Sequence, residues 1–393
     1  MKSINEFIAA SAVIIFPASV LVVDKVYGAV FLIVILLGIW QMVAYRKEIF
    51  PISKDEKLFF LSLCFVMVTV VITTVVNDTD MARADRFLAL FLAIPAYYFF
   101  KRNLFDEKYI WIGLILGALI AAGTAIYQVT GLTYCPIKPV RAHGAVHRII
   151  FGDLALLMGV MSLVSIGWFW QRKQWFILIP VLAFFSGILA SVLSLTRGGW
   201  ISLPFLFLVF IWFLSRKISR GKNVFLTILF ILLVLGLYLV PQTGVQQRVK
   251  AAAVNIEIYN ESQVVNDGRR YTPIGLRLEM WKASWLIFKD HPWVGVGWGE
   301  YSKHAQYFAD IGLINKGAAV FYHPHNQYFS ALAKGGVLGF IAVLVFYFIQ
   351  IVLFYRSTKY FACPEKQNLA LVGLLLITGF IGFGLTESIL ERS

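Results

Sequence analysis

Long apolar runs alternate with short polar segments along most of the chain. A helix that crosses a membrane needs about 20 mostly apolar residues, and eleven segments reach or nearly reach that length. They are residues 7–23, 26–45, 58–77, 87–100, 109–130, 151–171, 175–195, 200–215, 224–240, 328–355 and 369–387. The pattern predicts an all-α, polytopic integral membrane protein with about 11–12 transmembrane helices.

One region interrupts this pattern. Residues 241–325 mix polar and apolar positions between the ninth and tenth apolar segments, and the region is too long for a plain connection. We therefore expect three parts in chain order. Residues 1–240 form a transmembrane bundle, residues 241–325 form a helical region outside the membrane, and residues 326–393 form the C-terminal transmembrane helices.

A helix start is predicted inside the interrupting region. Thr272-Pro273 places a capping residue before a proline at the first helical position. Residues 274–289 are amphipathic, as expected of a helix along the membrane surface. Trp281 and Trp285 lie one turn apart there, which is typical of interfacial tryptophans.

Composition excludes the soluble classes. Of 393 residues, 59% are apolar and 14% are charged, whereas soluble proteins carry about 45–50% and about 25%. So few charges cannot cover the surface of a soluble enzyme, a disordered tail or a coiled coil. The three cysteines, Cys64, Cys135 and Cys363, are too scattered for a disulfide scaffold or a zinc site.

The distribution of positive charge predicts topology rather than nucleic-acid binding. The net charge is +14, but most Lys and Arg stand in short clusters between apolar runs. With the N-terminus in the cytoplasm, the cytoplasmic loops and Lys2 carry 17 Lys and Arg, and the short outer loops and C-terminal tail carry 8. This bias places residues 241–325 on the outer side.

The two ends of the chain carry further expectations. The first apolar segment has only Lys2 before it and more spans after it, so we expect an uncleaved anchor. Eleven spans would leave the C-terminal tail outside. Either a twelfth helix follows Ser393 or one span is miscounted.

Polar motifs at the outer membrane face are the candidates for chemistry, because a charge near lipid is costly unless it has a role or a partner. The first is Ser-Leu-Thr-Arg-Gly-Gly-Trp at residues 194–200. Arg197 can grip a phosphate with two parallel hydrogen bonds, and the two glycines allow close approach to the backbone. The alternative is a snorkelling arginine that ends a helix.

Two more motifs follow in the region outside the membrane and at its end. Arg277 lies on the predicted surface helix, where it either reaches over the bundle mouth or belongs to an ion pair or a solvated face. His325 precedes the tenth apolar segment, and a neutral histidine can take a proton from an attacking hydroxyl near pH 7. The alternative is an interfacial histidine with a satisfied hydrogen bond. His323 and His325 suggest a metal, but no carboxylate or cysteine joins them locally, so we expect none.

Two familiar energy-coupling motifs are absent from the sequence. It contains neither a Walker loop nor a dinucleotide fingerprint. We therefore expect no cofactor. The outer-face arginines and histidine suggest a substrate that arrives already activated, with a phosphate leaving group.

The order and spacing of these motifs resemble those of the bacterial O-antigen ligase family. Its superfamily also holds O-antigen polymerases and protein O-oligosaccharyltransferases. The resemblance rests on Thr196-Arg197-Gly198-Gly199, Gly275-Leu276-Arg277, His291-Pro292, Gly295-Val296-Gly297-Trp298-Gly299, His325-Asn326 and Gly335-Gly336-Val337-Leu338-Gly339.

The resemblance implies a GT-C-like glycosyltransferase of the bacterial inner membrane with a periplasmic, metal-independent active site. Its donor would be a glycan on undecaprenyl diphosphate and its acceptor a sugar hydroxyl of lipid A–core, with inversion at the transferred sugar. Arg197 and Arg277 would hold the diphosphate, and His325 would be the base. Further residues implied to line the donor site are Arg86, Arg141, Arg148 and Asn326. Family members usually have twelve spans with both ends in the cytoplasm.

Three alternatives remain at this point. A polymerase of the same superfamily would join one lipid-linked glycan to another. A lipid-linked glycan flippase or other transporter would place ionisable residues at mid-membrane depth, whereas here they gather at one face. A structural membrane subunit would leave the two arginines and the histidine unexplained.

Overall fold

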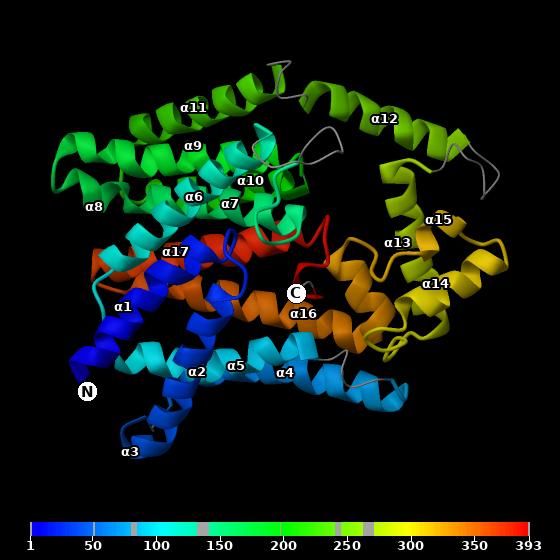
Figure 1. The fold of residues 1–393 in the computed structure, drawn as a ribbon, viewed down its shortest axis with the longest axis horizontal. Helices are drawn as coiled ribbons and strands as arrows, with labels where there is room; N and C mark the ends of the chain where they lie inside the picture. The colour runs from blue at the N-terminus through cyan, green and yellow to red at the C-terminus, as the bar shows by residue number, and fades with distance from the viewer. Residues whose placement is uncertain are drawn as a thin grey trace. The chain divides into compact units, whose positions relative to one another are not determined.

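The structure is a computed structural model that describes residues 2–49, 52–79, 85–131, 141–196, 198–239, 245–261 and 271–391. Over these residues the regular structure consists of helices, with no strand (Figure 1). The predicted all-α class is confirmed.

Each of the eleven apolar segments contains a helix. These are α1 (Lys2–Ser19), α2 (Val26–Ala44), α4 (Lys54–Val76), α5 (Asp85–Arg102), α6 (Lys108–Val129), α7 (Arg148–Ser162) with η2 (Leu163–Ser165) and α8 (Ile166–Trp170), η3 (Gln174–Ile177) with α9 (Leu178–Leu193), η4 (Gly198–Ile201) with α10 (Ser202–Leu214), α11 (Arg220–Leu239), α16 (Gln327–Tyr360) and α17 (Pro364–Phe383). A short helix, α3 (Arg46–Ile49), follows α2. Among the described residues, seven helices are long and apolar enough to span a membrane, and two more are apolar but shorter.

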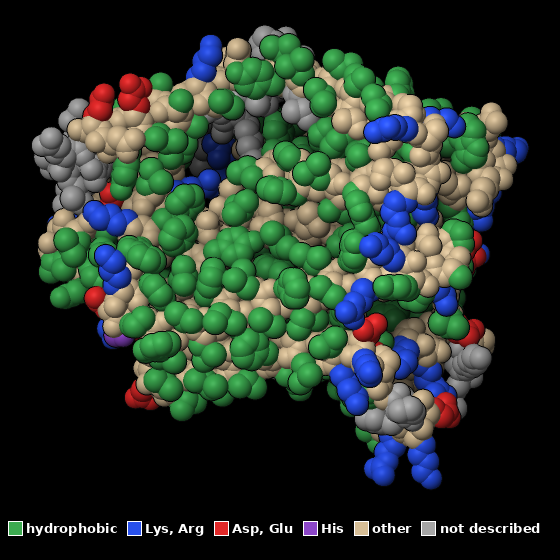
Figure 2. All heavy atoms as spheres, turned by 180° about the vertical axis from the view of Figure 1, so that it is seen from behind, with side chains coloured by type: hydrophobic (Ala, Val, Ile, Leu, Met, Phe, Trp, Pro, Cys, Tyr) green, Lys and Arg blue, Asp and Glu red, His purple; other side chains and the backbone are tan. Residues whose placement is uncertain are grey.

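The surface carries many apolar side chains. Val43 is 73% exposed and Phe225 is 65% exposed. Figure 2 shows hydrophobic side chains covering much of one face of the molecule. A soluble monomer rarely exposes apolar patches larger than a few hundred Å², so this surface is that of a multi-pass membrane protein.

The chain forms two compact units from interleaved segments. The first unit is Met1–Leu61, Ala89–Phe207 and Phe348–Phe383; the second is Ser62–Leu88, Leu208–Tyr347 and Gly384–Ser393. In the first unit α7 and α9 approach closely through small residues. A Cβ added to Gly187 would lie 2.4 Å from the carbonyl oxygen of Ala155. Such small-residue contacts are typical of helices that pack within a membrane.

The region that interrupts the apolar pattern is helical, as predicted, and belongs to the second unit. It contains α12 (Val245–Glu261), α13 (Pro273–Asp290), α14 (Tyr301–Asp310) and α15 (Lys316–Ala319). The hydroxyl of Thr272 accepts a hydrogen bond of 3.0 Å from the Gly275 N–H, and Pro273 occupies the first helical turn. The predicted helix start is therefore confirmed.

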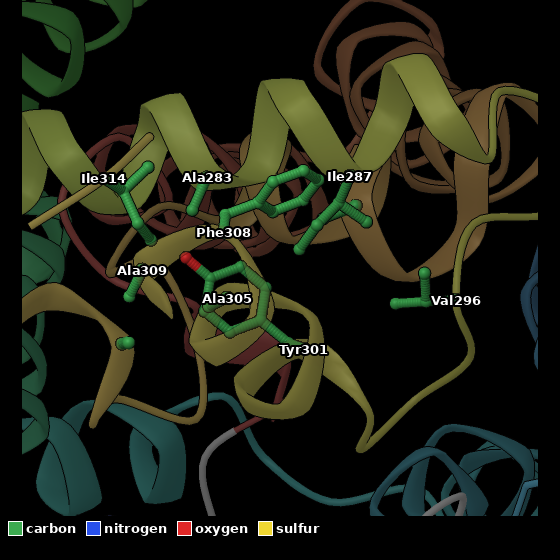
Figure 3. Close-up of a cluster of buried hydrophobic side chains, with 10 residues drawn as sticks. Ala283, Ile287, Val296, Tyr301, Ala305, Phe308, Ala309 and Ile314 are labelled. Atoms are coloured by element: carbon green, nitrogen blue, oxygen red, sulfur yellow. The ribbon is translucent and has the colours of Figure 1, made fainter. Parts of the chain in front are cut away.

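A small core packs α13, α14 and α15 against one another (Figure 3). Tyr301 of α14 is fully buried, and its hydroxyl donates a hydrogen bond of 2.9 Å to the carbonyl of Met280 in α13. The other members are apolar: Ala283, Ile287, Val296, Ala305, Phe308, Ala309, Ile314, Ala319 and Ala333. This core fixes α14 against α13 and reaches the first turns of α16 through Ala333.

Helix α16 is broken at Gly336, where φ is 60° and ψ is −155°. The loop that contains Gly295 and Gly297 fills the break. The N–H groups of Val296 and Gly297 donate to the carbonyls of Ala333 and Lys334 at 3.1 and 2.9 Å. The N–H groups of Val337 and Leu338 donate to the carbonyls of Pro292 and Trp293 at 2.8 and 3.2 Å. Backbone groups freed by the break are thus satisfied, as an apolar environment requires.

The break predicts a stability defect for Gly336→Ala. That backbone conformation is nearly restricted to glycine and costs other residues about 1–3 kcal/mol. A new Cβ would also lie 2.4 Å from the Trp293 carbonyl carbon. We expect a clear fall in Tm on thermal unfolding in detergent. Gly123→Ala is the matched control, because nothing lies within 4 Å of its Cβ position; an equal fall in both variants would contradict this account.

Candidate active site

The two histidines lie on the segment that leads into α16. Pro324 separates them, and His325 has a φ of 49°, an uncommon conformation for a residue other than glycine. The N–H of His325 donates a hydrogen bond of 3.3 Å to Nδ1 of His323. Their rings lie 4.5 Å apart between centroids. Strained backbone of this kind is found at functional sites.

Asn326 fixes the start of α16. Its Oδ1 accepts hydrogen bonds from the N–H groups of Tyr328 and Phe329 at 3.0 and 3.1 Å, which is the geometry of a helix N-cap. Its Nδ2 donates to the carbonyl of Leu385 at 3.0 Å. Asn326 therefore fixes the backbone next to His325. Contact between Asn326 and a glycan donor stays a prediction.

Glu387 approaches the histidines from the far end of the chain. Helix α17 ends at Phe383, four residues before the predicted end of the last apolar segment, and the chain then turns back. Glu387 is fully buried. Its Oε2 lies 3.1 Å from Nδ1 of His325, and its Oε1 lies 3.4 Å from Nδ1 of His323.

The carboxylate determines which ring nitrogen of His325 is available. A carboxylate only accepts, so its bond to His325 forms when Nδ1 carries the proton. The neutral ring then has its lone pair on Nε2, which is the atom that a general base uses. The His325 side chain is 14% exposed. The arrangement thus resembles the histidine–carboxylate pair of hydrolase triads.

The segment that carries Glu387 is tied to the first turns of α16. The N–H of Gln327 donates to the carbonyl of Gly384 at 2.8 Å, and the N–H of Leu390 donates to Oε1 of Gln327 at 2.9 Å. Two turns along, the ammonium of Lys334 pairs with the carboxylate of Glu391, and both groups are buried. These contacts hold the C-terminal segment in register with the histidines.

Helix α13, which carries Arg277, contacts the histidine segment. Trp281, one turn after Arg277, donates its indole N–H to the carbonyl of Pro324 at 3.0 Å. The Trp281 ring also stacks on Phe329 at 5.5 Å. Because residues four apart share a face of a helix, Arg277 is on the side of α13 that meets the histidine segment. Trp281 is thus partly buried against the histidine segment, whereas Trp285 is exposed.

The other arginines predicted for the site are only partly described by the structure. Arg141 and Arg148 belong to the first unit, beside the end of α9: Ala142 N–H donates to Leu193 O at 3.1 Å, and Thr196 Oγ1 donates to Arg148 O at 3.4 Å. Arg197 lies outside the described residues. Arg86 is in α5, but its side chain is outside the described part of the chain.

Sequence reasoning missed two acidic residues. Asp153 of α7 is fully buried, and a Cβ at Gly199 would lie 2.2 Å from its Oδ1. Asp153 could have been identified from the sequence, because a lone carboxylate inside an apolar segment suggests function. Glu387 is the one charged residue of the last apolar segment, but its pairing with His325 gave no local signal, since 62 residues separate the two.

Comparisons with known proteins agree with the resemblance seen in the motifs. A family model described as O-antigen ligase matches residues 181–344, a range that contains Arg197, Arg277, His325 and Asn326. A protein of Haemophilus influenzae (strain ATCC 51907 / DSM 11121 / KW20 / Rd), described as uncharacterized, is 26% identical over 380 residues. The match covers 96% of this chain and 92% of that protein. The resemblance to the O-antigen ligase family is confirmed over the matched residues.

Removal of one member of the buried Lys334–Glu391 ion pair should strongly destabilise the folded protein. Lys334→Met removes the ammonium and leaves a buried carboxylate without that partner, a change that costs about 3–5 kcal/mol. We expect a large fall in Tm in detergent. The double variant Lys334→Met/Glu391→Leu should regain most of the loss; a double variant as unstable as the single one would show that the pair does not hold this segment.

Proposed function

We propose that this protein is an O-antigen ligase of the bacterial inner membrane. It transfers a glycan from undecaprenyl diphosphate to a sugar hydroxyl of lipid A–core at the periplasmic face during lipopolysaccharide biosynthesis, with inversion and without metal or nucleotide. The observation that carries the proposal is the His325–Glu387 pair at the start of α16. The family match over residues 181–344 supports it.

His325 acts as the general base. Its Nε2 takes the proton of the acceptor hydroxyl as the acceptor oxygen forms a bond to the anomeric carbon of the donor glycan. The bond from that carbon to the diphosphate oxygen breaks, and undecaprenyl diphosphate leaves with the electron pair. Attack opposite the leaving group inverts the anomeric centre. Glu387 stabilises the imidazolium that forms.

The arginines act on the leaving group. Guanidinium groups bind phosphate oxygens through paired hydrogen bonds, and charge that develops on the diphosphate needs such donors. Arg277, on the α13 face that meets the histidine segment, and Arg197 take this role. Arg86, Arg141, Arg148 and Asn326 line the donor site.

Other functions differ in acceptor or in class. An O-antigen polymerase or a protein O-oligosaccharyltransferase would use the same base with another acceptor. A flippase needs no base, so the buried carboxylate on His325 favours an enzyme.

Transfer in vitro tests the proposal. Purified protein is mixed with undecaprenyl-diphosphate glycan and lipid A–core in the presence of chelator and without nucleotide. We expect glycan-capped lipid A–core. Positioned general bases contribute about 10²–10⁴-fold, so His325→Ala should lower kcat by about that factor. Arg277→Lys should also lose activity, because lysine lacks the paired donors.

The controls separate chemistry from folding. Arg356→Lys changes an arginine with a half-exposed side chain and should keep full activity. Longer lipid-linked glycans in place of capped core would identify a polymerase. Movement of labelled lipid across the bilayer without either product would contradict the enzyme.

A double-mutant cycle tests the His325–Glu387 unit. Glu387→Gln removes the charge that orients the ring, and we expect kcat to fall by at least about 10²-fold, within the range that such a base contributes. Residues that act as one unit are non-additive, so His325→Ala/Glu387→Gln should be no slower than His325→Ala. Independent, multiplicative losses would contradict the unit.

A further inference from the structure

We propose that His323, His325 and Glu387 form a binding site for a divalent transition metal ion of the Zn²⁺ class. We further propose that metal occupancy and the use of His325 as base exclude each other. The second statement rests on the proposed function, whereas the first does not.

The three side chains bring potential metal ligands close together. Each offers one ligand atom, and these atoms lie within 4.8 Å of one another. The two imidazole nitrogens lie 3.4 and 3.1 Å from the Glu387 oxygens. In a tetrahedral Zn²⁺ site with bonds of about 2.0–2.2 Å, ligand atoms are about 3.3–3.6 Å apart. The two nitrogen–oxygen distances involve different oxygens of Glu387, and the full set of three atoms spans up to 4.8 Å, so the side chains would have to move together to bind the ion.

The electrostatics of the cluster favour a cation. Nδ1 of His323 carries the lone pair that accepts the His325 N–H at 3.3 Å, a long hydrogen bond that a metal ion would replace. The same nitrogen lies 3.4 Å from an oxygen of the buried Glu387 carboxylate. A cation held by both rings and this carboxylate would interact favourably with the negative charge inside the protein. Two histidines and one glutamate are also a ligand set that Zn²⁺ uses while keeping a fourth position open.

Occupancy would disable the base. Without metal, the proton of His325 is on Nδ1 and the lone pair is on Nε2. A metal ion on Nδ1 needs that lone pair, so the proton of the neutral ring moves to Nε2. Nε2 is then a donor and cannot accept the proton of a hydroxyl. The ion would act as an inhibitor rather than as a catalyst.

Direct binding is the first test. Zn²⁺ is titrated into metal-free full-length protein in detergent, and Co²⁺ is added in its place to record the absorption of the bound ion. We expect one tight site. Glu387→Gln and His323→Ala should each weaken Zn²⁺ binding by more than about tenfold. Mutations of residues that only support metal ligands already cost about 10–100-fold in affinity, and loss of a ligand should cost at least as much. Far-UV circular dichroism confirms folding, and either folded variant is sufficient.

A second histidine pair serves as the control. The rings of His291 and His304 lie 5.3 Å apart. Burial lowers the pKa of His304, which favours the neutral ring that a metal binds, so this pair is the competing candidate for zinc. His304→Ala should leave binding unchanged. Loss of binding in His304→Ala, or equal binding in all variants, would overturn the site.

Inhibition is measured separately. In the transfer assay without chelator, Zn²⁺ should abolish turnover at the concentration that fills the site, and chelator should restore it. Full turnover with the site filled would overturn the exclusion. A preparation that binds Zn²⁺ at this cluster but transfers no glycan even with chelator would refute the proposed function and still support the metal site.

Discussion

The site depends on one contact, the buried Glu387 carboxylate against the imidazole of His325. A carboxylate held away from water needs hydrogen-bond donors. Glu387 accepts the N–H of Ser388 at 3.0 Å and contacts His325, which lies 62 residues earlier in the chain. Gln327 and Lys334 hold the C-terminal segment, Asn326 caps α16, and Trp281 supports the Pro324 carbonyl. The histidine is therefore placed by tertiary contacts and not by local sequence.

The break in α16 gives this site its second support. Carbonyls released at Gly336 are satisfied by the loop at Val296 and Gly297, which also joins the core around Tyr301. The two glycine-rich motifs of the sequence thus face each other as backbone partners. Their glycines allow the two backbones to approach closely, and the candidate catalytic residues are polar residues elsewhere in the sequence.

The sequence predicted the helices well, because apolar length and capping are local signals. All eleven apolar segments contain helices, and Thr272 caps α13. Partners distant in sequence were beyond its reach. Nothing in the composition near His325 indicates Glu387, and nothing near Trp281 indicates that its indole N–H donates to the Pro324 carbonyl. Asp153 was overlooked, although a lone acid in an apolar run is a usable signal.

The central claim concerns the proton on one ring, which nitrogen chemical shifts report directly. Histidine labelled with ¹⁵N would be introduced into the metal-free protein, and the His325 signals would be assigned by their loss in His325→Gln. The contact with Glu387 predicts that Nδ1 carries a proton, so that the lone pair of the neutral ring is on Nε2. A ring protonated on Nε2 alone would contradict the account, because its Nδ1 would then face the carboxylate without a proton to donate.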